Sequence, residues 1–165
     1  SFLFSGTVQE NIKFHKPNGS NEAMRQAART AQAAPFIESL DASYHSEVVR
    51  GGMNFSGGQK QRISIARALY KDADLYVFDD SFSALDYKTD AILRQALKKD
   101  MPEATYLIIA QRVSTIMNAD QIIVMDQGHI VGIGTHTSLM QTSPVYRQFA
   151  ESQHIFDEQE ETDHV

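Results

Sequence analysis

One short segment constrains this chain more than any other, because it places two glycines at the start of a strong helical pattern. Residues 55–62 read Phe-Ser-Gly-Gly-Gln-Lys-Gln-Arg, and small and aliphatic residues follow at helical spacing as far as Leu69. Glycines at a helix N-terminus let backbone N–H groups approach a ligand closely, and the aligned peptide dipoles favour an anion there. The hydroxyl of Ser56 can donate one more hydrogen bond. The segment therefore predicts a phosphate-binding helix N-terminus, although taken alone it is also typical of an ordinary loop.

The composition excludes several classes of protein. The chain has 165 residues, of which 42% are hydrophobic, and it has no cysteine. A disulfide scaffold, a thiolate metal site and a cysteine nucleophile are therefore excluded, and a reducing compartment is favoured. Aliphatic runs such as residues 107–110 are far shorter than the roughly 18 residues of a membrane-spanning helix. We expect one globular domain, or part of a larger one, that does not cross a membrane by itself.

The net charge of −6 is concentrated at one end of the chain. The last 15 residues hold six of the 21 acidic residues and none of the 15 basic ones, so residues 1–150 carry 15 of each sign. The acidity therefore belongs to a tail, which we expect to be a solubilising end. A neutral body argues against general nucleic-acid binding, which requires a basic face.

Hydrophobic periodicity divides the chain into two parts of different character. In the first part we expect a helix over residues 21–34 with Ser20 or Asn21 as its cap, a break at Pro35 and a short helix at 36–40. No strand stands out there after residue 4. Beyond it, strands and helices alternate: strands at 75–78, 106–110, 121–125 and 129–133, a helix at 86–100 and a hairpin turn at 126–128. Strands joined through helices imply a parallel sheet covered on both faces.

Residues 54–69 closely resemble the signature motif and the following helix of ATP-binding cassette (ABC) proteins. Other motifs of that family have counterparts in the expected order: the segment just after the Q-loop at 3–12, an exporter-type X-loop at 47–52, a Walker B strand at 75–79 and a D-loop at 83–86. The resemblance extends over residues 1–150. It indicates the nucleotide-binding domain of an ABC exporter.

The resemblance implies an α/β fold: part of an ABC ATPase domain of the P-loop NTPase type, with a mostly parallel sheet flanked by helices and an additional α-helical subdomain. Residues 1–70 would form the helical subdomain with the X-loop and the signature motif. Residues 71–150 would form the C-terminal half of the RecA-like core, with the Walker B strand, the D-loop and the switch region. Residues 151–165 remain as an acidic tail that we expect to be disordered.

The same resemblance implies ATP and Mg²⁺ as cofactors. The carboxylate of Asp79, at the end of the Walker B strand, is the expected Mg²⁺ ligand. The expected nucleotide-binding residues belong to the signature motif and the D-loop: Phe55, Ser56, Gly57, Gly58, Gln59 and Asp86.

The phosphate-cradling loop of the family does not occur in this sequence. There is no G-x-x-x-x-G-K-[ST] pattern, and the Q-loop glutamine and the adenine-stacking aromatic residue would also lie before residue 1. The chain therefore resembles a C-terminal fragment of the domain. We expect this fragment alone neither to bind ATP tightly nor to hydrolyse it.

Two predicted catalytic positions depart from the family pattern. Asp80 stands where the family has a Glu that positions and deprotonates the attacking water. Its carboxylate is one methylene shorter, which retracts it by roughly 1 Å, a displacement that can cost about 100-fold in rate. Gln111 stands where the family has the switch His, in an Ile-Ala-Gln-Arg context. An amide can bind a phosphate oxygen but cannot carry positive charge.

Each position also has a purely structural interpretation. Asp80 could cap a helix that begins at Ser81, and Gln111 could be an ordinary polar residue at a strand end. The surrounding motifs favour the catalytic interpretation for both. Together the two departures predict a weakened site.

The resemblance also implies partners. Two such domains assemble head to tail in this family, so the intact signature motif would complete an ATP site on a second nucleotide-binding domain. Because Asp80 and Gln111 depart from the pattern, we expect that partner to be a different subunit. Transmembrane domains of the same transporter are the other implied partner, which places the assembly at the cytoplasmic face of the plasma membrane.

Two rival functions remain at this stage. The subunit could be a non-hydrolytic module that holds ATP and gates a competent partner. It could also be a soluble cassette protein acting on DNA or ribosomes, but the exporter-like X-loop and the neutral body disfavour this alternative. Substrate specificity resides in membrane segments that this sequence does not contain, so the transported substrate is undefined.

Overall fold

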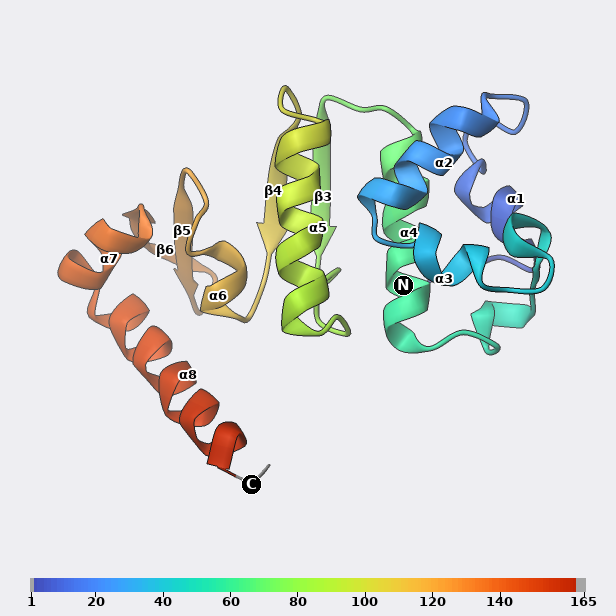
Figure 1. Cartoon of the computed structure of the whole chain (residues 1–165). Helices are drawn as coiled ribbons and strands as arrows, with labels where there is room; N and C mark the ends of the chain where they lie inside the picture. Colours follow the sequence, from blue (N-terminus) through green and yellow to red (C-terminus); the bar gives the residue numbers. More distant parts are fainter. Residues whose placement is uncertain (1, 163–165) are drawn as a thin grey trace. The chain divides into compact units, whose positions relative to one another are not determined.

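The computed structural model describes the backbone of residues 2–162 and the side chains of residues 2–153. The chain forms two compact units, residues 1–109 and residues 110–165, and each is described by itself. Figure 1 shows the order of the elements along the chain. The residues with predicted chemistry at 55–59, 79, 80 and 86 all belong to the first unit.

The first unit begins with a helical part in which short elements pack around one long helix. This helix, α4 (Gly57–Tyr70), contacts both α1 and α2. The other elements are β1 (Gly6–Thr7), α1 (Val8–Ile12), α2 (Asn21–Thr30), α3 (Ala34–Glu38), η1 (Ser43–His45), β2 (Glu47–Val48) and η2 (Arg50–Gly52). Fully buried apolar side chains from α1, α2, α3 and α4 form the core between them: Ile12, Met24, Ala28, Ile37, Ile63 and Ala66.

The expected helix caps and breaks are confirmed only in part. Ser20 caps α2, as expected, and its Oγ accepts hydrogen bonds from the N–H groups of Glu22 and Ala23. The helix ends at Thr30 rather than at residue 34. The expected break lies at residues 31–33, a few residues earlier than predicted, and Pro35 itself lies in the first turn of α3. That position tolerates proline, since its missing N–H would have no acceptor within the helix.

Two very short strands escaped the sequence analysis. β1 and β2 pair antiparallel, with Gly6 opposite Val48 and Thr7 opposite Glu47. Two-residue strands contain no periodicity that a sequence pattern could reveal. Their pairing links the start of the chain to the segment predicted as the X-loop.

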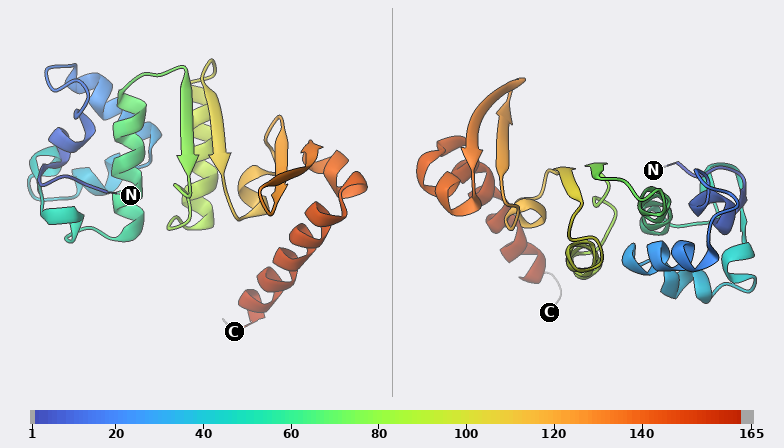
Figure 2. Two further views of the ribbon diagram at one scale, coloured as in Figure 1. Left: turned by 180° about the vertical axis from the view of Figure 1, so that it is seen from behind. Right: turned by 90° about the horizontal axis from the view of Figure 1, so that it is seen from above.

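The first unit ends with a parallel β–α–β arrangement, as expected. β3 (Leu75–Asp79) pairs in parallel with β4 (Thr105–Ile109), and α5 (Tyr87–Asp100) connects them. The rings of Tyr76 and Tyr106 stack at 5.8 Å between centroids on the buried face of the strands. Figure 2 shows α5 along one face of this strand pair.

The two faces of the β3–β4 strand pair differ in exposure within the first unit. Exposure alternates along the strands, so that Tyr76 and Phe78 are buried whereas their neighbours are not. Within the first unit, α5 covers one face only. The aliphatic side chains of the other face remain about half exposed: Leu75, Val77, Leu107 and Ile109.

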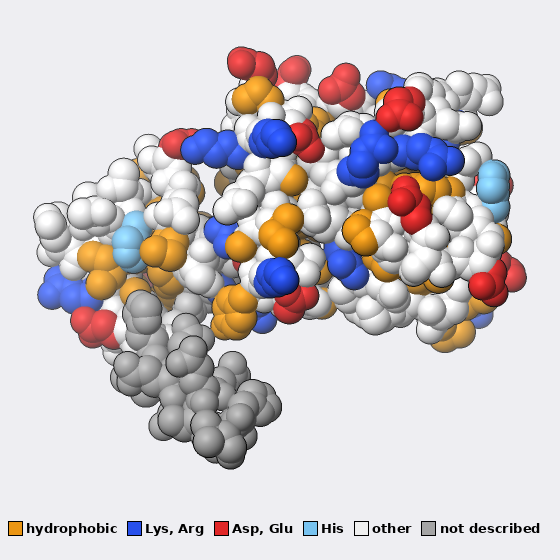
Figure 3. Space-filling model, in the orientation of Figure 1, with side chains coloured by type: hydrophobic (Ala, Val, Ile, Leu, Met, Phe, Trp, Pro, Cys, Tyr) orange, Lys and Arg blue, Asp and Glu red, His pale blue; other side chains and the backbone are white. Residues whose placement is uncertain are grey.

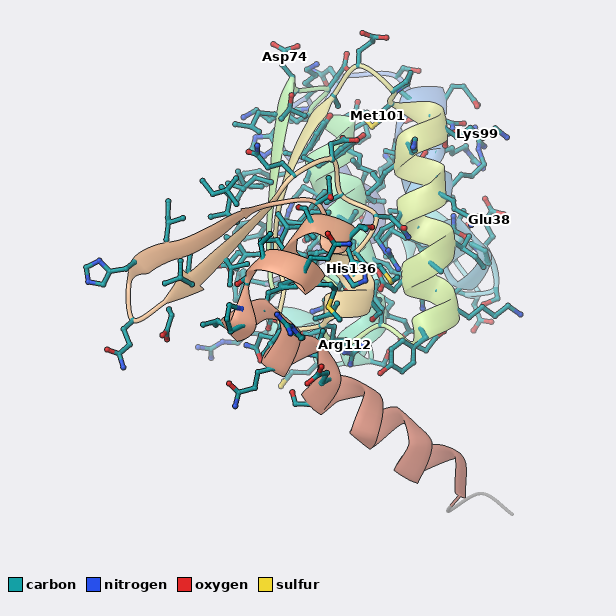
Figure 4. All side chains as sticks on the ribbon, turned by 90° about the vertical axis from the view of Figure 1, so that its left-hand side faces the viewer. Glu38, Asp74, Lys99, Met101, Arg112 and His136 are labelled. Atoms are coloured by element: carbon teal, nitrogen blue, oxygen red, sulfur yellow. The ribbon has the colours of Figure 1, made fainter. Side chains whose placement is uncertain are left out.

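The described residues of the second unit form a β-hairpin and three helices. β5 (Ile122–Asp126) and β6 (His129–Gly134) pair antiparallel, and Gln127 and Gly128 form the predicted turn with positive φ angles. The helices are α6 (Val113–Ile116), α7 (His136–Thr142) and α8 (Pro144–Thr162). The Nδ1 atom of His136, labelled in Figure 4, lies 2.9 Å from the hydroxyl of Tyr146 and joins α7 to α8.

Residues 151–162 of the predicted acidic tail belong to α8, so the expected disorder is wrong for this described part of the tail, and residues 163–165 lie outside the described residues. Among the described residues, no helix combines the length and the apolar character needed to span a bilayer.

The N-terminus of α5 provides a first test of this fold. The Asp86 carboxylate accepts hydrogen bonds from the Thr89 Oγ1 at 2.7 Å and the Thr89 N–H at 2.9 Å. These bonds lower the pKa of Asp86. We expect Asp86→Ala to lower the melting temperature near neutral pH, and Asp86→Asn, which can still cap the helix, to lower it less.

The pH dependence follows from the lowered pKa. The stabilisation by the charged carboxylate is complete above the unfolded pKa of about 3.9 and is lost as the pH falls through the lower folded value. Thermal unfolding of wild type and Asp86→Ala should therefore give melting temperatures that converge in strong acid. A gap that stays constant with pH would contradict the charged cap.

Candidate functional site

The N-terminus of α4 is built as a reciprocal cap. Ser56 has extended backbone angles, and its Oγ accepts a hydrogen bond from the Gln59 N–H at 3.2 Å. In return, the Gln59 Oε1 accepts one from the Ser56 N–H at 2.9 Å. The cap uses the Ser56 hydroxyl only as an acceptor, so its proton can still be donated.

This cap leaves the first turn of α4 suited to an anion. The N–H groups of Gly57 and Gly58 stand at helix positions that have no acceptor within the helix. The dipole of the 14-residue helix adds partial positive charge at the same end. A phosphate oxygen is the kind of group that such a terminus binds.

Phe55 contributes differently from the other predicted binding residues. Its side chain is only 7% exposed, and its ring centroid lies 6.3 Å from that of Phe36. The guanidinium of Arg62 lies over the ring of Phe36, at 4.8 Å from its centroid. Phe55 therefore anchors the start of the motif in the helical core, and its contact with a nucleotide stays a prediction.

The loop predicted as the D-loop packs directly against the two glycines. A Cβ atom at Gly58 would lie 2.9 Å from the carbonyl oxygen of Ala84, which is too close for a real contact. A Cβ at Gly57 would lie 3.5 Å from the Cβ of Ala84, an ordinary contact. Gly58 is thus required by the close approach of a backbone, whereas Gly57 leaves room on the side of the loop.

Asp79 and Asp80 lie at the carboxyl end of β3, and both are exposed. Asp79 is the last residue of the strand, opposite Ile109 of β4. Asp80 adopts a left-handed conformation with φ of 49°. Residues 81–84 form turns, so the alternative that Asp80 caps a helix beginning at Ser81 is wrong.

The backbone of Asp80 is held at both polar groups. Its N–H donates to the Ile109 carbonyl at 3.2 Å. Its carbonyl accepts from the Ser83 Oγ at 3.1 Å and from the Gln61 Nε2 at 3.1 Å. Left-handed angles are rare for residues other than glycine, but aspartate tolerates them better than most residues.

Two residues with a role in this arrangement escaped the sequence analysis. Gln61 is 8% exposed and reaches the loop after β3 from α4. The Asn54 amide bridges the predicted X-loop: its Nδ2 donates to the Glu47 carbonyl, and its Oδ1 accepts from the Val49 N–H. A signal for Gln61 existed, because it lies four residues before Ile65 on the apolar side of the helix.

Gln111 belongs to the second unit. Its side chain is exposed, and its carbonyl accepts a hydrogen bond from the side chain of Gln153. The Oε1 of Gln153 accepts a hydrogen bond from the Val113 N–H at 2.7 Å. Gln153 therefore anchors to α8 the segment that carries Gln111.

The first unit thus brings four predicted features together: the capped helix N-terminus, the loop at 83–86, and the two carboxylates at the end of β3. A family model described as ABC transporter matches residues 1–83, which include the α4 motif and both carboxylates. The chain belongs to the ABC transporter family.

Named relatives within this family agree with that assignment. The chain is 44% identical over 158 residues to an uncharacterized ABC transporter ATP-binding protein of Mycobacterium bovis, covering 94% of this chain and 27% of the relative. It is 41% identical over 155 residues to a putative multidrug export ATP-binding/permease protein of Bacillus subtilis, with coverages of 94% and 27%. It is 44% identical over 144 residues to an ATP-dependent lipid A-core flippase of Chromohalobacter salexigens, with coverages of 87% and 25%.

The solved structures agree as well. A bacterial Atm1-family ABC exporter with ATP bound superimposes with a TM-score of 0.90 at 35% identity, covering 93% of this chain and 27% of that exporter. The expected α/β fold of an ABC ATPase domain is therefore confirmed. The chain spans about a quarter of the length of the relatives that it matches.

The two signature glycines should respond differently to the same added methyl group. Alanine stabilises a helix by up to about 1 kcal/mol relative to glycine. At Gly57 the methyl group meets only an ordinary contact, so we expect Gly57→Ala to keep or raise the melting temperature. Gly58→Ala would drive a methyl group to 2.9 Å from the Ala84 carbonyl, so the loop must shift and the melting temperature should fall. Thermal unfolding followed by circular dichroism compares the pair, and the reverse order would contradict the contact.

Proposed function

We propose that this chain is part of the ATP-binding domain of an ABC exporter, in which ATP binding and hydrolysis power efflux of a substrate across the membrane. The capped N-terminus of α4, packed against the loop at 83–86, is the observation that carries the proposal. It supplies N–H donors and a helix dipole for phosphate, and it lies in the region that the family model matches. The exporters among the relatives support the same direction.

The residues take distinct roles in this proposal. Ser56, Gly57 and Gly58 bind phosphate oxygens of an ATP molecule whose other contacts come from a second nucleotide-binding domain. Asp79 holds Mg²⁺. Among the described residues no group of three or more acidic or histidine side chains forms a ready metal cage. That agrees with Mg²⁺, which is usually held by one or two carboxylates together with substrate phosphates and water.

Hydrolysis in this proposal is an in-line attack by water, assisted mainly by positioning. Bound Mg²⁺ supplies charge neutralisation at the phosphoryl oxygens. Asp80 orients the water and accepts its proton, but its carboxylate is shorter than the usual Glu. Gln111 contributes a neutral hydrogen bond to phosphate. The site that these residues help to build is therefore slow, and the faster site lies on the Walker motifs of a different partner subunit.

The proposal extends to the organisation of the chain. Residues 1–70 are the helical subdomain, which meets the transmembrane domains through the segment at 47–52. Residues 71–150 are the C-terminal half of the ATPase core.

The assembly lies at the cytoplasmic face of the plasma membrane. Because the sequence contains no P-loop, this chain alone is expected to be inactive. The proposal includes no nucleic-acid partner, because residues 1–150 carry equal numbers of acidic and basic residues. On the face seen in Figure 3 basic and acidic side chains are interspersed.

A second candidate function is a non-hydrolytic half that holds ATP and gates its partner. The short carboxylate of Asp80 favours it, since a poorly positioned base prolongs the ATP-bound state. The amide at Gln111 favours it for the same reason. The two candidates differ in whether the ATP site that this subunit's own carboxylates help to build hydrolyses ATP.

Restoring the family residues separates the candidates. We expect the double change Asp80→Glu with Gln111→His to raise ATP turnover of the intact complex, because both replaced groups act on the attacking water and the phosphate. The measurement is steady-state ATPase in lipid, with the subunit alone and together with its partner subunit. An unchanged or lower ATPase rate of the two subunits together would contradict the hypothesis that Asp80 and Gln111 weaken the site. Comparable activity from the unmodified subunit alone would favour a homodimeric exporter.

The head-to-tail arrangement generates a further expectation. Ser56→Ala or Gly57→Asp should reduce ATPase of the complex more than Asp80→Asn does, because the first two act on the faster site. Removal of one phosphate donor typically costs about 100-fold or more when it stabilises the transition state. Equal losses, or a larger loss from Asp80→Asn, would contradict the asymmetry.

A further inference from the structure

The side chain of Gln61 links the N-terminal turns of α4 to the loop that follows β3. Gln61 lies in the second turn of α4, four residues after Gly57, and it is 8% exposed. Its Nε2 donates to the carbonyl of Asp80 at 3.1 Å and to the Oγ of Ser83 at 3.2 Å. Its Oε1 accepts from the N–H of Ala84 at 3.0 Å. A buried amide with three such bonds is a strong tie, because leaving any one of these groups unpaired is costly.

The hydrogen bond from Gln61 to the Asp80 carbonyl holds a backbone segment in an unfavourable conformation. Asp80 is in the left-handed region, and a residue stays there only when its surroundings impose the conformation. Ile109 and Ser83 supply two of its backbone contacts from the neighbouring strand and from the loop itself. Gln61 supplies the one contact that comes from α4.

The remaining bonds act on the loop that lies against the signature glycines. The N–H of Ala84 is held by Gln61, and the carbonyl of the same residue lies against Gly58. The loop is thus held on both sides of one residue by α4. The first turns of α4 therefore contact both this loop and the Asp80 backbone.

We propose that Gln61 is a positioning residue for ATP hydrolysis. Its amide keeps the carboxylate at position 80 in one place relative to the signature motif. It would thereby connect the helix terminus that serves the partner's ATP to the base that serves this subunit's own ATP. The inference rests on the proposed function and assigns a new participant to the same site.

Gln61→Met tests the amide while it preserves the side-chain length and the apolar packing. We compare steady-state ATP turnover of the full-length transporter in two backgrounds, Asp80→Glu and Asp80→Asn. The difference in kcat between these backgrounds measures what a carboxylate at position 80 contributes. With Gln61→Met present, we expect this difference to fall by about tenfold, because the two residues are coupled, while the KM for ATP changes by less than about twofold.

A purely structural role for Gln61 would give a different result. Both backgrounds would then lose activity by the same factor together with a large loss of melting temperature, or neither would change, and either result overturns the proposal. Gln95→Met is the matched control, since Gln95 is an exposed glutamine on α5, and we expect its kcat to stay within about twofold of wild type.

Two further outcomes are decisive. If Asp80→Glu adds nothing over Asp80→Asn while Gln61 is intact, the weakened-site account fails. The present proposal fails with it, because a carboxylate that contributes nothing to kcat cannot be positioned for hydrolysis; if Asp80→Glu does add activity and Gln61→Met leaves that gain unchanged, the present proposal alone is overturned. If Gln61→Met does not fold, Gln61→Glu replaces it, because that carboxylate keeps the shape and the acceptor but cannot donate to the Asp80 carbonyl.

Discussion

The packing of the α4 N-terminus against the loop that follows β3 governs the chemistry of the first unit. At this contact the carbonyl of Ala84 approaches Gly58 so closely that no side chain fits between them. The amide of Gln61 closes the same contact with bonds to Asp80, Ser83 and Ala84. Since buried polar groups are costly to leave unpaired, the helix terminus and the loop form one rigid arrangement.

That contact places two kinds of charge in one unit. The first turn of α4 offers N–H donors and the positive end of a helix dipole, which attract phosphate. The end of β3 offers the carboxylates of Asp79 and Asp80, which attract a divalent cation. In the proposed arrangement the two groups serve different nucleotides: the α4 terminus meets the phosphates of the partner's ATP, and the carboxylates meet the Mg²⁺ of this subunit's own ATP. The family model covers both features.

Local sequence signals predicted much of this fold. Ser20, one of the two predicted caps of α2, accepts hydrogen bonds from the first N–H groups of that helix. The strands predicted at 75–78 and 106–110 from their aliphatic and aromatic runs agree with β3 and β4 to within one residue at each end. The failures have physical reasons. The strands β1 and β2 are too short to have a period, and Pro35 is tolerated because it stands in the first turn of a helix.

The motif order, the family resemblance and the cap of α2 were readable along the chain, because these features involve residues at most three positions apart or fixed spacings. The left-handed backbone of Asp80, the need for glycine at Gly58 and the hydrogen bonds of Gln61 became visible only in the folded chain. Each of these arises from a contact between segments about 20 to 30 residues apart, as between Gln61 and Asp80. No local pattern encodes such a contact, because it exists only once α4 and β3 have packed together.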